Sequence, residues 1–322
     1  MNQIELKKIV KQLSSLGERQ LYNETRARFL IEHILTENKI IYAVQKFTTY
    51  IPRTSKTWIK TDKGIIRAMA TSFVSGIISN KNHLISSLTS SQPFIYKPNI
   101  NFNPECKIIS RSNHYFAPAV AIAASDVAKI IAAKNVHCRI KTRRVKHQSG
   151  NILIGNIKNP ENIIFSHYDS IGPGAVDNAS GIALSLWLIK NNPSLLETCL
   201  FVLAGNEELS YDQPLYWGYG YRMFEKTRQN LLSISKKIIV LDCIGHTSTK
   251  TIRDINTLML GFPIISIKKL SKKIVMLSGD IQKLMKIYHS DLDTWDKINY
   301  QELERAGKIA LRLLGATNNA TS

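Results

Sequence analysis

The second half of the chain alternates between short apolar runs and stretches with helical spacing. The runs cover residues 151–157, 162–166, 199–204 and 237–241, and the helical stretches cover 182–192 and 220–232. Continuous apolar strands that alternate with helices are typical of a sheet buried on both faces. This pattern predicts an α/β fold for the second half.

The first half follows this pattern only at its start. Residues 1–37 are expected to form two helices that break near residues 15–17, and residues 40–51 a strand that ends at Pro52. Residues 52–147 contain Ser/Asn-rich and irregular stretches and a short helical segment near 125–134. We therefore predict a small inserted subdomain or lid over 52–147. It separates an N-terminal part of the catalytic domain (1–51) from the catalytic core (148–322).

Composition indicates a globular chain. Of its 322 residues, 44% are apolar, and no apolar run approaches the length of a membrane span. The first ten residues lack the apolar core and cleavage site of a signal peptide. Four scattered cysteines form no C-x-x-C pair, which favours free thiols in a reducing compartment. We expect a cytoplasmic protein with no membrane contact.

The positive charge is concentrated in the first half of the chain. Residues 1–150 hold 24 Lys and Arg against 8 Asp and Glu, and residues 151–322 hold 19 against 16. The run Arg139–Lys146 has the alternation of a strand with one charged face. Because no nucleic-acid-binding motif accompanies the charge, we interpret it as a solvated surface and do not expect nucleic-acid binding.

Candidate metal ligands follow the predicted strands. His167 ends the run 162–166, and Asp169 is placed to accept its ring N–H. Asp177 lies in a Gly- and Ala-rich loop ahead of a helix, where it could bind metal or cap the helix. In open α/β sheets, ligands bind at the carboxyl ends of strands, so these side chains are expected at one site.

Three further segments offer the same chemistry. In the pair Glu207-Glu208, one carboxylate could bind metal while the other acts as a base, although two acids also suit a helix N-terminus. Asp242 ends the run 237–241, where a plain turn former would also fit. In Tyr288-His289, the imidazole could bind metal or be a buried structural histidine, and the hydroxyl could steady an oxyanion.

Together these segments resemble the two-zinc exopeptidases, the family that includes bacterial secreted aminopeptidases, aminopeptidase Y and glutamate carboxypeptidase. The resemblance rests on His167-Tyr-Asp169, Gly174-Ala-Val-Asp-Asn-Ala-Ser-Gly181, Asn206-Glu-Glu208, Leu241-Asp242 and Tyr288-His289. It covers about residues 148–300. It implies a phosphorylase/hydrolase-like mixed sheet with helices on both faces.

The resemblance also implies a role for each residue. Asp177 would bridge two Zn²⁺ ions, with His167 and Asp242 completing one site and Glu208 and His289 the other; Co²⁺ or Mn²⁺ could take the same donors. Glu207 would deprotonate a metal-bound water, Asp169 would buttress His167, and Tyr288 would hydrogen-bond the tetrahedral intermediate.

The expected activity is that of a metallo-aminopeptidase, with short peptides as substrates. Three alternatives remain open at this point. Glutaminyl cyclases share the scaffold with a single zinc, a carboxypeptidase would act on the other peptide terminus, and the fold could serve as a binding module without catalysis. The aromatic stretch after Glu208, residues 209–221, departs from the family pattern and leaves side-chain specificity open.

Overall fold

The computed structural model describes residues 1–89, 94–213 and 215–316. By its contacts the chain divides into two units. The first contains Met1–Thr49, Gln148–Ile281 and Asp293–Ser322, and the second contains Tyr50–His147 and Gln282–Leu292. Among the described residues, no helix has the length and apolar character that would let it cross a bilayer.

The larger sheet is mixed, as the resemblance implied. Its strand order is β12-β13-β11-β9-β10-β8-β1-β2. The strands are β1 (Tyr42–Thr61), β2 (Gly64–Ile66), β8 (Val136–Gly155), β9 (Asn162–His167), β10 (Cys199–Ala204), β11 (Lys237–Leu241), β12 (Lys250–Ile252) and β13 (Ile274–Ser278). Strands β13, β11, β9 and β10 run parallel, while β12 and β8 pair antiparallel at either side. Every residue of β9 and β10 is buried, as their apolar runs predicted.

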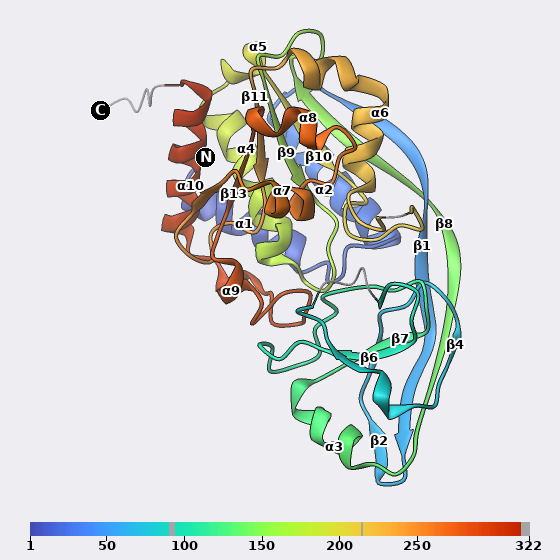
Figure 1. The fold of residues 1–322 in the computed structure, drawn as a ribbon. Coiled ribbons are helices and arrows are strands. Elements are labelled where there is room, and N and C mark those ends of the chain that lie inside the picture. The colour runs from blue at the N-terminus through green and yellow to red at the C-terminus, as the bar shows by residue number, and fades with distance from the viewer. Residues whose placement is uncertain (90–93, 214, 317–322) are drawn as a thin grey trace. The chain divides into compact units, whose positions relative to one another are not determined.

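Helices cover both faces of the parallel strands (Figure 1). Helices α1 (Gln3–Ser14), α4 (Ser180–Asn191) and α10 (Tyr300–Leu314) contact one another on one side. Helices α6 (Tyr219–Ile234), α7 (Ile255–Gly261) and α8 (Ile267–Leu270) share the hydrophobic core of the other side with β9, β10 and β11. The remaining helices and turns of this unit are α2 (Tyr22–Glu37), η4 (Ala175–Ala179), α5 (Leu195–Thr198), η5 (Ser271–Lys273) and η6 (Trp295–Lys297), and α9 (Ile281–Leu284) begins at its boundary. The α/β class with helices on both faces is confirmed.

The second unit has a small sheet and a core of its own. Its sheet has the order β3-β7-β6-β5, and β4 pairs with β8. Its elements are β3 (Met69–Ala70), β4 (Gly76–Ile78), η1 (Lys81–His83), β5 (Leu84–Ser86), β6 (Asn99–Phe102), β7 (Ala119–Ile122), η3 (Ala124–Asp126) and α3 (Val127–Ala132). Aliphatic side chains from β1, β8 and the small sheet meet in one cluster, which includes Ile59, Ile100, Val120 and Ile140.

The boundary of the second unit differs from the sequence prediction in one respect. Residues 282–292 were assigned to the catalytic core, but their contacts group them with residues 50–147. The amide of Asn103 donates to the Met285 carbonyl at 2.9 Å, and the Ser110 hydroxyl donates to the Tyr288 carbonyl at 2.6 Å. These long-range hydrogen bonds leave no periodic signal in the sequence.

Strand β1 also differs from its prediction, because it continues through Pro52 to Thr61. A proline ends ladder pairing only where its missing N–H is needed as a donor. Beyond Pro52 the strand still meets β8, with the hydroxyls of Thr54 and Thr142 at 2.9 Å. Exposed polar residues at 53–56 hide the alternation that identifies a strand.

The basic excess belongs to the second unit, which holds 18 Lys and Arg against 4 Asp and Glu. Along β8, the side chains of Arg139, Lys141 and Arg143 are exposed, while Ile140 and Thr142 between them are buried. The predicted strand with one charged face is therefore confirmed. The four cysteines are free and buried, also as expected.

Candidate metal centre

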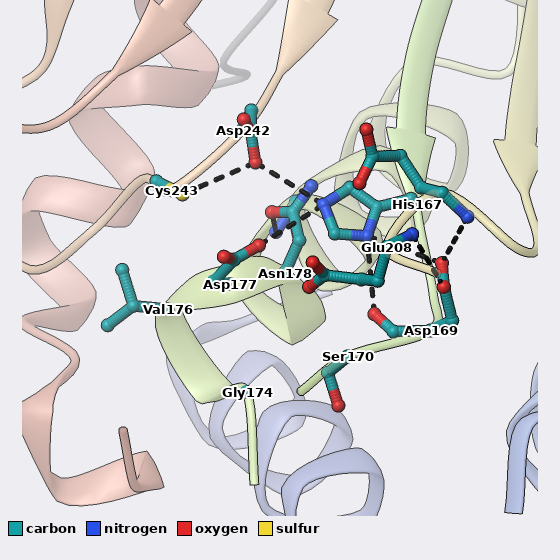
Figure 2. Close-up of polar contacts among 12 residues, drawn as sticks. His167, Asp169, Ser170, Gly174, Val176, Asp177, Asn178, Glu208, Asp242 and Cys243 are labelled. Carbon is teal, nitrogen blue, oxygen red and sulfur yellow. Dashed lines mark hydrogen bonds and ion pairs between the residues drawn. The ribbon is translucent and has the colours of Figure 1, made fainter. Parts of the chain in front are cut away.

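The predicted site residues of the first unit lie at one edge of the sheet. Strands β9, β10 and β11 are parallel, with His167 beside Ala204 and Phe165 beside Val240. Their carboxyl ends therefore coincide, and the acids that follow β10 and β11 meet the imidazole that ends β9 (Figure 2).

His167 is buried, and both of its ring nitrogens contact polar groups. Its Nδ1 lies 3.2 Å from the backbone carbonyl of Asp169 and 3.5 Å from the Asp169 carboxylate. A carbonyl can only accept, so Nδ1 donates, and Nε2 is the ring nitrogen that faces the candidate ligands. Nε2 lies 3.2 Å from Asp177 Oδ1 and 3.4 Å from Asp242 Oδ1. Burial lowers the pKa of His167, but interactions with Tyr221 and the surrounding carboxylates outweigh it and raise that pKa.

Asp177 lies in the turn Ala175–Ala179, which a second aspartate holds in place. The carboxylate of Asp293 accepts the backbone N–H of Val176 at 2.7 Å and that of Asp177 at 3.0 Å. The peptide bond from Asp177 to Asn178 is cis. The N-cap residue of helix α4 is Ala179, so the helix-cap interpretation of Asp177 is wrong.

Asn178 fastens the same turn to the end of β11. Its amide donates to the Leu241 carbonyl at 2.8 Å, and its Oδ1 accepts the N–H of Gly181 at 3.1 Å. A Cβ on Gly181 would lie 2.4 Å from Asn178 Oδ1 and 2.7 Å from the Leu241 carbonyl, so only glycine permits this approach. The turn therefore holds Asp177 close to Asp242, the residue that follows Leu241.

Glu207 and Glu208 follow β10 in a loop, and α6 begins only at Tyr219. The alternative that they start a helix is therefore wrong. The carboxylate of Asp169 accepts the N–H of Glu207 and that of Glu208, each at 2.9 Å. Both glutamates are buried. Burial raises the pKa of Glu207 well above its usual range, His167 opposes this, and the neighbouring carboxylates raise that pKa further.

Asp169 thus does more than the sequence indicated. Its carbonyl is the nearer acceptor for His167, as expected of a residue that orients this imidazole. Its carboxylate holds the backbone of the two glutamates. Asp169 therefore positions His167, the candidate ligand at the end of β9. It also positions the loop after β10 that carries the candidate base Glu207 and the candidate ligand Glu208.

Two groups of potential metal donors share Asp177. His167, Asp177 and Glu208 form one group, and Asp177, Asp242 and Cys243 the other, with the donor atoms of each group within 4.8 Å of one another. Zinc binds imidazole and carboxylate donors at about 2.0–2.2 Å, which places two donors on one ion roughly 3–4.4 Å apart. The donors fit a zinc ion after small movements, and a cation would offset the clustering of buried carboxylates.

Tyr288 and His289 belong to the second unit. The Nδ1 atom of the buried His289 lies 3.2 Å from the Arg111 carbonyl, and its ring stacks on Tyr288 with centroids 3.7 Å apart. By the argument applied to His167, Nδ1 donates to this carbonyl. In both histidines Nδ1 is therefore engaged by a backbone carbonyl, which leaves Nε2 as the nitrogen that can bind a metal.

The sequence analysis missed Arg19, a fully buried cation beside the site. Its guanidinium donates to the carbonyls of Tyr168 at 2.6 Å, Pro173 at 2.6 Å and Gly174 at 2.9 Å. Burial lowers the pKa of Arg19 to about 10, although nearby carboxylates oppose this. Arg19 thus holds the loop that leads from β9 to the Asp177 turn.

Replacing Arg19 with methionine is expected to destabilise the fold by about 3–5 kcal/mol, because buried carbonyls and carboxylates lose their cation. Arg19→Lys should recover only part of this loss, since an ammonium cannot reproduce the planar fork. Urea unfolding measures both variants. Arg26→Met, on an exposed position of α2, is the matched control and should change stability by less than about 0.5 kcal/mol.

Asp293 is a further support of the site. Its hydrogen bonds to the Asp177 turn show its main role. Burial raises its pKa to about 7, the charge of Asp177 raises it, and the hydrogen bonds from the turn oppose both. A carboxylate this costly to bury is retained here as the support of Asp177.

Comparison with known proteins agrees with this geometry. Residues 153–252 match the model of peptidase family M28. A zinc aminopeptidase from Bacillus subtilis superposes with a TM-score of 0.70 at 17% identity, covering 100% of this chain and 97% of that one. An aminopeptidase from an Aneurinibacillus species gives a TM-score of 0.64 at 16% identity, covering 97% and 93%. A glutaminyl cyclase from Fimbriiglobus ruber gives 0.53 at 12%, covering 97% and 94%.

No curated protein matches the sequence significantly. The structural likenesses, all below 20% identity, establish the fold. The family match spans the strands and loops that carry His167, Asp177, Glu208 and Asp242. The chain therefore has the fold of the zinc aminopeptidases, and its residues 153–252 match peptidase family M28.

Proposed function

We propose that this chain is a two-zinc aminopeptidase that removes N-terminal residues from short peptides. The observation that carries the proposal is the pair of donor groups that share Asp177. A carboxylate common to two groups is the arrangement expected of a bridging ligand between two ions. The aminopeptidase fold of the Bacillus subtilis and Aneurinibacillus enzymes supports the same activity.

The ligands divide between two ions. The division follows the resemblance and not the two donor groups as such, which share only Asp177. His167 and Asp242 would hold one ion together with Asp177, because Nε2 of the imidazole lies 3.2 Å from Asp177 and 3.4 Å from Asp242. Glu208 would hold the other with Asp177. His289, which the resemblance adds to that second ion, is supported by the contact of its Nδ1 with the Arg111 carbonyl.

Zinc bound here would acidify a water molecule and polarise the scissile carbonyl. Glu207 would take the proton of the attacking water and deliver it to the leaving amine. The carboxylate of Asp169 holds the Glu207 backbone and so limits the positions that this base can adopt. The hydroxyl of Tyr288 would hydrogen-bond the developing oxyanion.

Glutaminyl cyclisation is the second candidate, because a cyclase shares the fold at a TM-score of 0.53. The two reactions differ in metal content and in product. A cyclase with one zinc per chain would convert an N-terminal glutamine into a ring, whereas a two-zinc aminopeptidase would release free amino acids. A carboxypeptidase would be recognised by activity on N-blocked peptides.

The purified protein is expected to release N-terminal residues from a panel of aminoacyl amides. Removal of metal with a chelator should abolish the activity, and added Zn²⁺ should restore it, since Glu207 alone cannot acidify water sufficiently. Metal analysis should find two ions per chain. A single ion, together with cyclisation of N-terminal glutamine, would contradict the proposal in favour of the cyclase.

A further inference from the structure

Tyr221, in the first turn of α6, is fully buried beside the candidate metal centre. Its hydroxyl makes no hydrogen bond with any residue that the structure describes. A buried hydroxyl without a partner costs free energy, so its presence requires an explanation. Tyr221 lies within residues 153–252, which match peptidase family M28.

Ring contacts place the Tyr221 side chain on the same side of the sheet as His167. Phe165 precedes His167 by two residues in β9, so both side chains point to one face. Tyr221 packs edge-to-face against Phe165 with centroids 5.6 Å apart, and against Phe262 at 4.9 Å. Burial raises the pKa of Tyr221 well above its usual value. His167 opposes this increase, whereas the charges of Glu207 and Asp242 raise the pKa further. The hydroxyl thus stays protonated and can donate.

The two carboxylate oxygens of Asp242 have different surroundings. Oδ1 lies 3.4 Å from Nε2 of His167 and accepts a hydrogen bond from the Cys243 thiol at 3.4 Å (Figure 2). Within residues 1–89, 94–213 and 215–316, no donor reaches Oδ2. Oδ1 therefore faces the imidazole side of the centre, and Oδ2 is the outer oxygen.

The outer oxygen lies close to the chain segment that packs on Tyr221. A Cβ on Gly261 would lie 3.3 Å from Asp242 Oδ2. The next residue is Phe262, whose ring contacts Tyr221. Gly261 thus leaves room beside Oδ2, at the place where the aromatic cluster of Phe165, Phe262 and Tyr221 approaches the centre.

We propose that Tyr221 is a positioning residue whose hydroxyl donates a hydrogen bond to the outer oxygen of Asp242 when the carboxylate turns toward a bound cation. This inference rests on the proposed function, because it takes Asp242 as a metal ligand. Hydrogen bonds to the outer oxygen of a ligating carboxylate orient it, and their loss typically weakens metal binding 10–100-fold. The cost of burying the hydroxyl in the metal-free protein is then recovered on metal binding.

The test is Tyr221→Phe in the full-length protein, first stripped of metal and then titrated with Zn²⁺ against a chromophoric chelator. One of the two ions should bind about 10–100-fold more weakly, and the other as in the wild type. The metal-free variant should melt no lower than the metal-free wild type, because the substitution removes only an unpartnered hydroxyl. A residue with a purely structural role would instead lower the melting temperature and the zinc affinity together, and that result overturns the inference.

Tyr219→Phe is the matched control, since Tyr219 lies in the same helix turn and donates to the Thr48 carbonyl at 3.4 Å. This substitution should change neither the zinc affinity nor the melting temperature of the metal-free protein. In an Asp242→Asn background, Tyr221→Phe should weaken zinc binding no further, since the two residues act through one hydrogen bond. If the wild type binds two zinc ions and cleaves peptides but Tyr221→Phe binds zinc unchanged, the inference alone fails. If the wild type binds no zinc, the proposed function fails with it.

Discussion

Replacing Glu207 with glutamine should lower kcat/KM by about 10²–10⁴-fold and leave both zinc ions bound. The amide has the size of the carboxyl group but cannot accept a proton, so only the base is lost. The backbone N–H of Glu207 still donates to Asp169, which keeps Glu208 and its loop in place. Metal analysis and steady-state kinetics on an aminoacyl amide measure the two quantities.

Glu208→Gln is the matched control, because it makes the same change one residue along the same loop. It should lose the ion that Glu208 holds, and activity should fall with metal content. Glu207→Asp retains a carboxylate but withdraws it by one methylene, and a misplaced base is expected to lose activity about 10²-fold. Turnover of Glu207→Gln within a fewfold of the wild type would show that another group takes the proton.

The positions of His167, Glu208 and Asp242 could be predicted because each ends or follows a strand with a clear apolar run. His167 ends β9, and Asp242 follows β11. The carboxyl ends of parallel strands lie at one edge of the sheet. Ligands that follow such strands in the sequence are therefore expected at one site. The fold class could be predicted for the same reason, since a strand that is buried on both faces consists of a continuous run of apolar residues.

The supports of the site could not be predicted, because their partners are backbone groups far away in the sequence. Asp293 binds the N–H of Asp177 across 116 positions. Arg19 binds the carbonyl of Gly174 across 155 positions. Backbone amides and carbonyls are present at every residue, so such pairs carry no compositional signal. A charged residue beside a predicted helix break, as Arg19 is, was the one available sign of a buried role.

The competing interpretations of single residues were separated only by the structure. An aspartate before a helix and a pair of acids after a strand each suit a cap or a ligand equally well. Ala179 is the N-cap residue of α4, and α6 begins only at Tyr219, which removed the capping alternatives for Asp177 and for Glu207-Glu208. The local sequence therefore identifies residues that suit either role, and only the tertiary structure excludes one of the two roles.

Replacing Asp177 with asparagine should remove both zinc ions, whereas Asp242→Asn and Glu208→Gln should each remove one. The reason is the geometry of the donor groups, which share Asp177 and otherwise differ. A neutral amide at the shared position weakens both sites at once. After dialysis against a weak chelator, the metal content per chain should therefore be two ions for the wild type, none for Asp177→Asn, and one each for Asp242→Asn and Glu208→Gln.

Stability of the metal-free forms provides the control for this series. Asp177, Glu208 and Asp242 are carboxylates that gather around His167, and their mutual repulsion opposes folding when no cation is bound. Neutralising any one of them should leave the metal-free melting temperature unchanged or raised, so loss of metal cannot be attributed to unfolding. If Asp177→Asn retained one tightly bound ion, the carboxylate would belong to a single site, and the bridging arrangement would have to be abandoned even if the enzyme proved to be a peptidase.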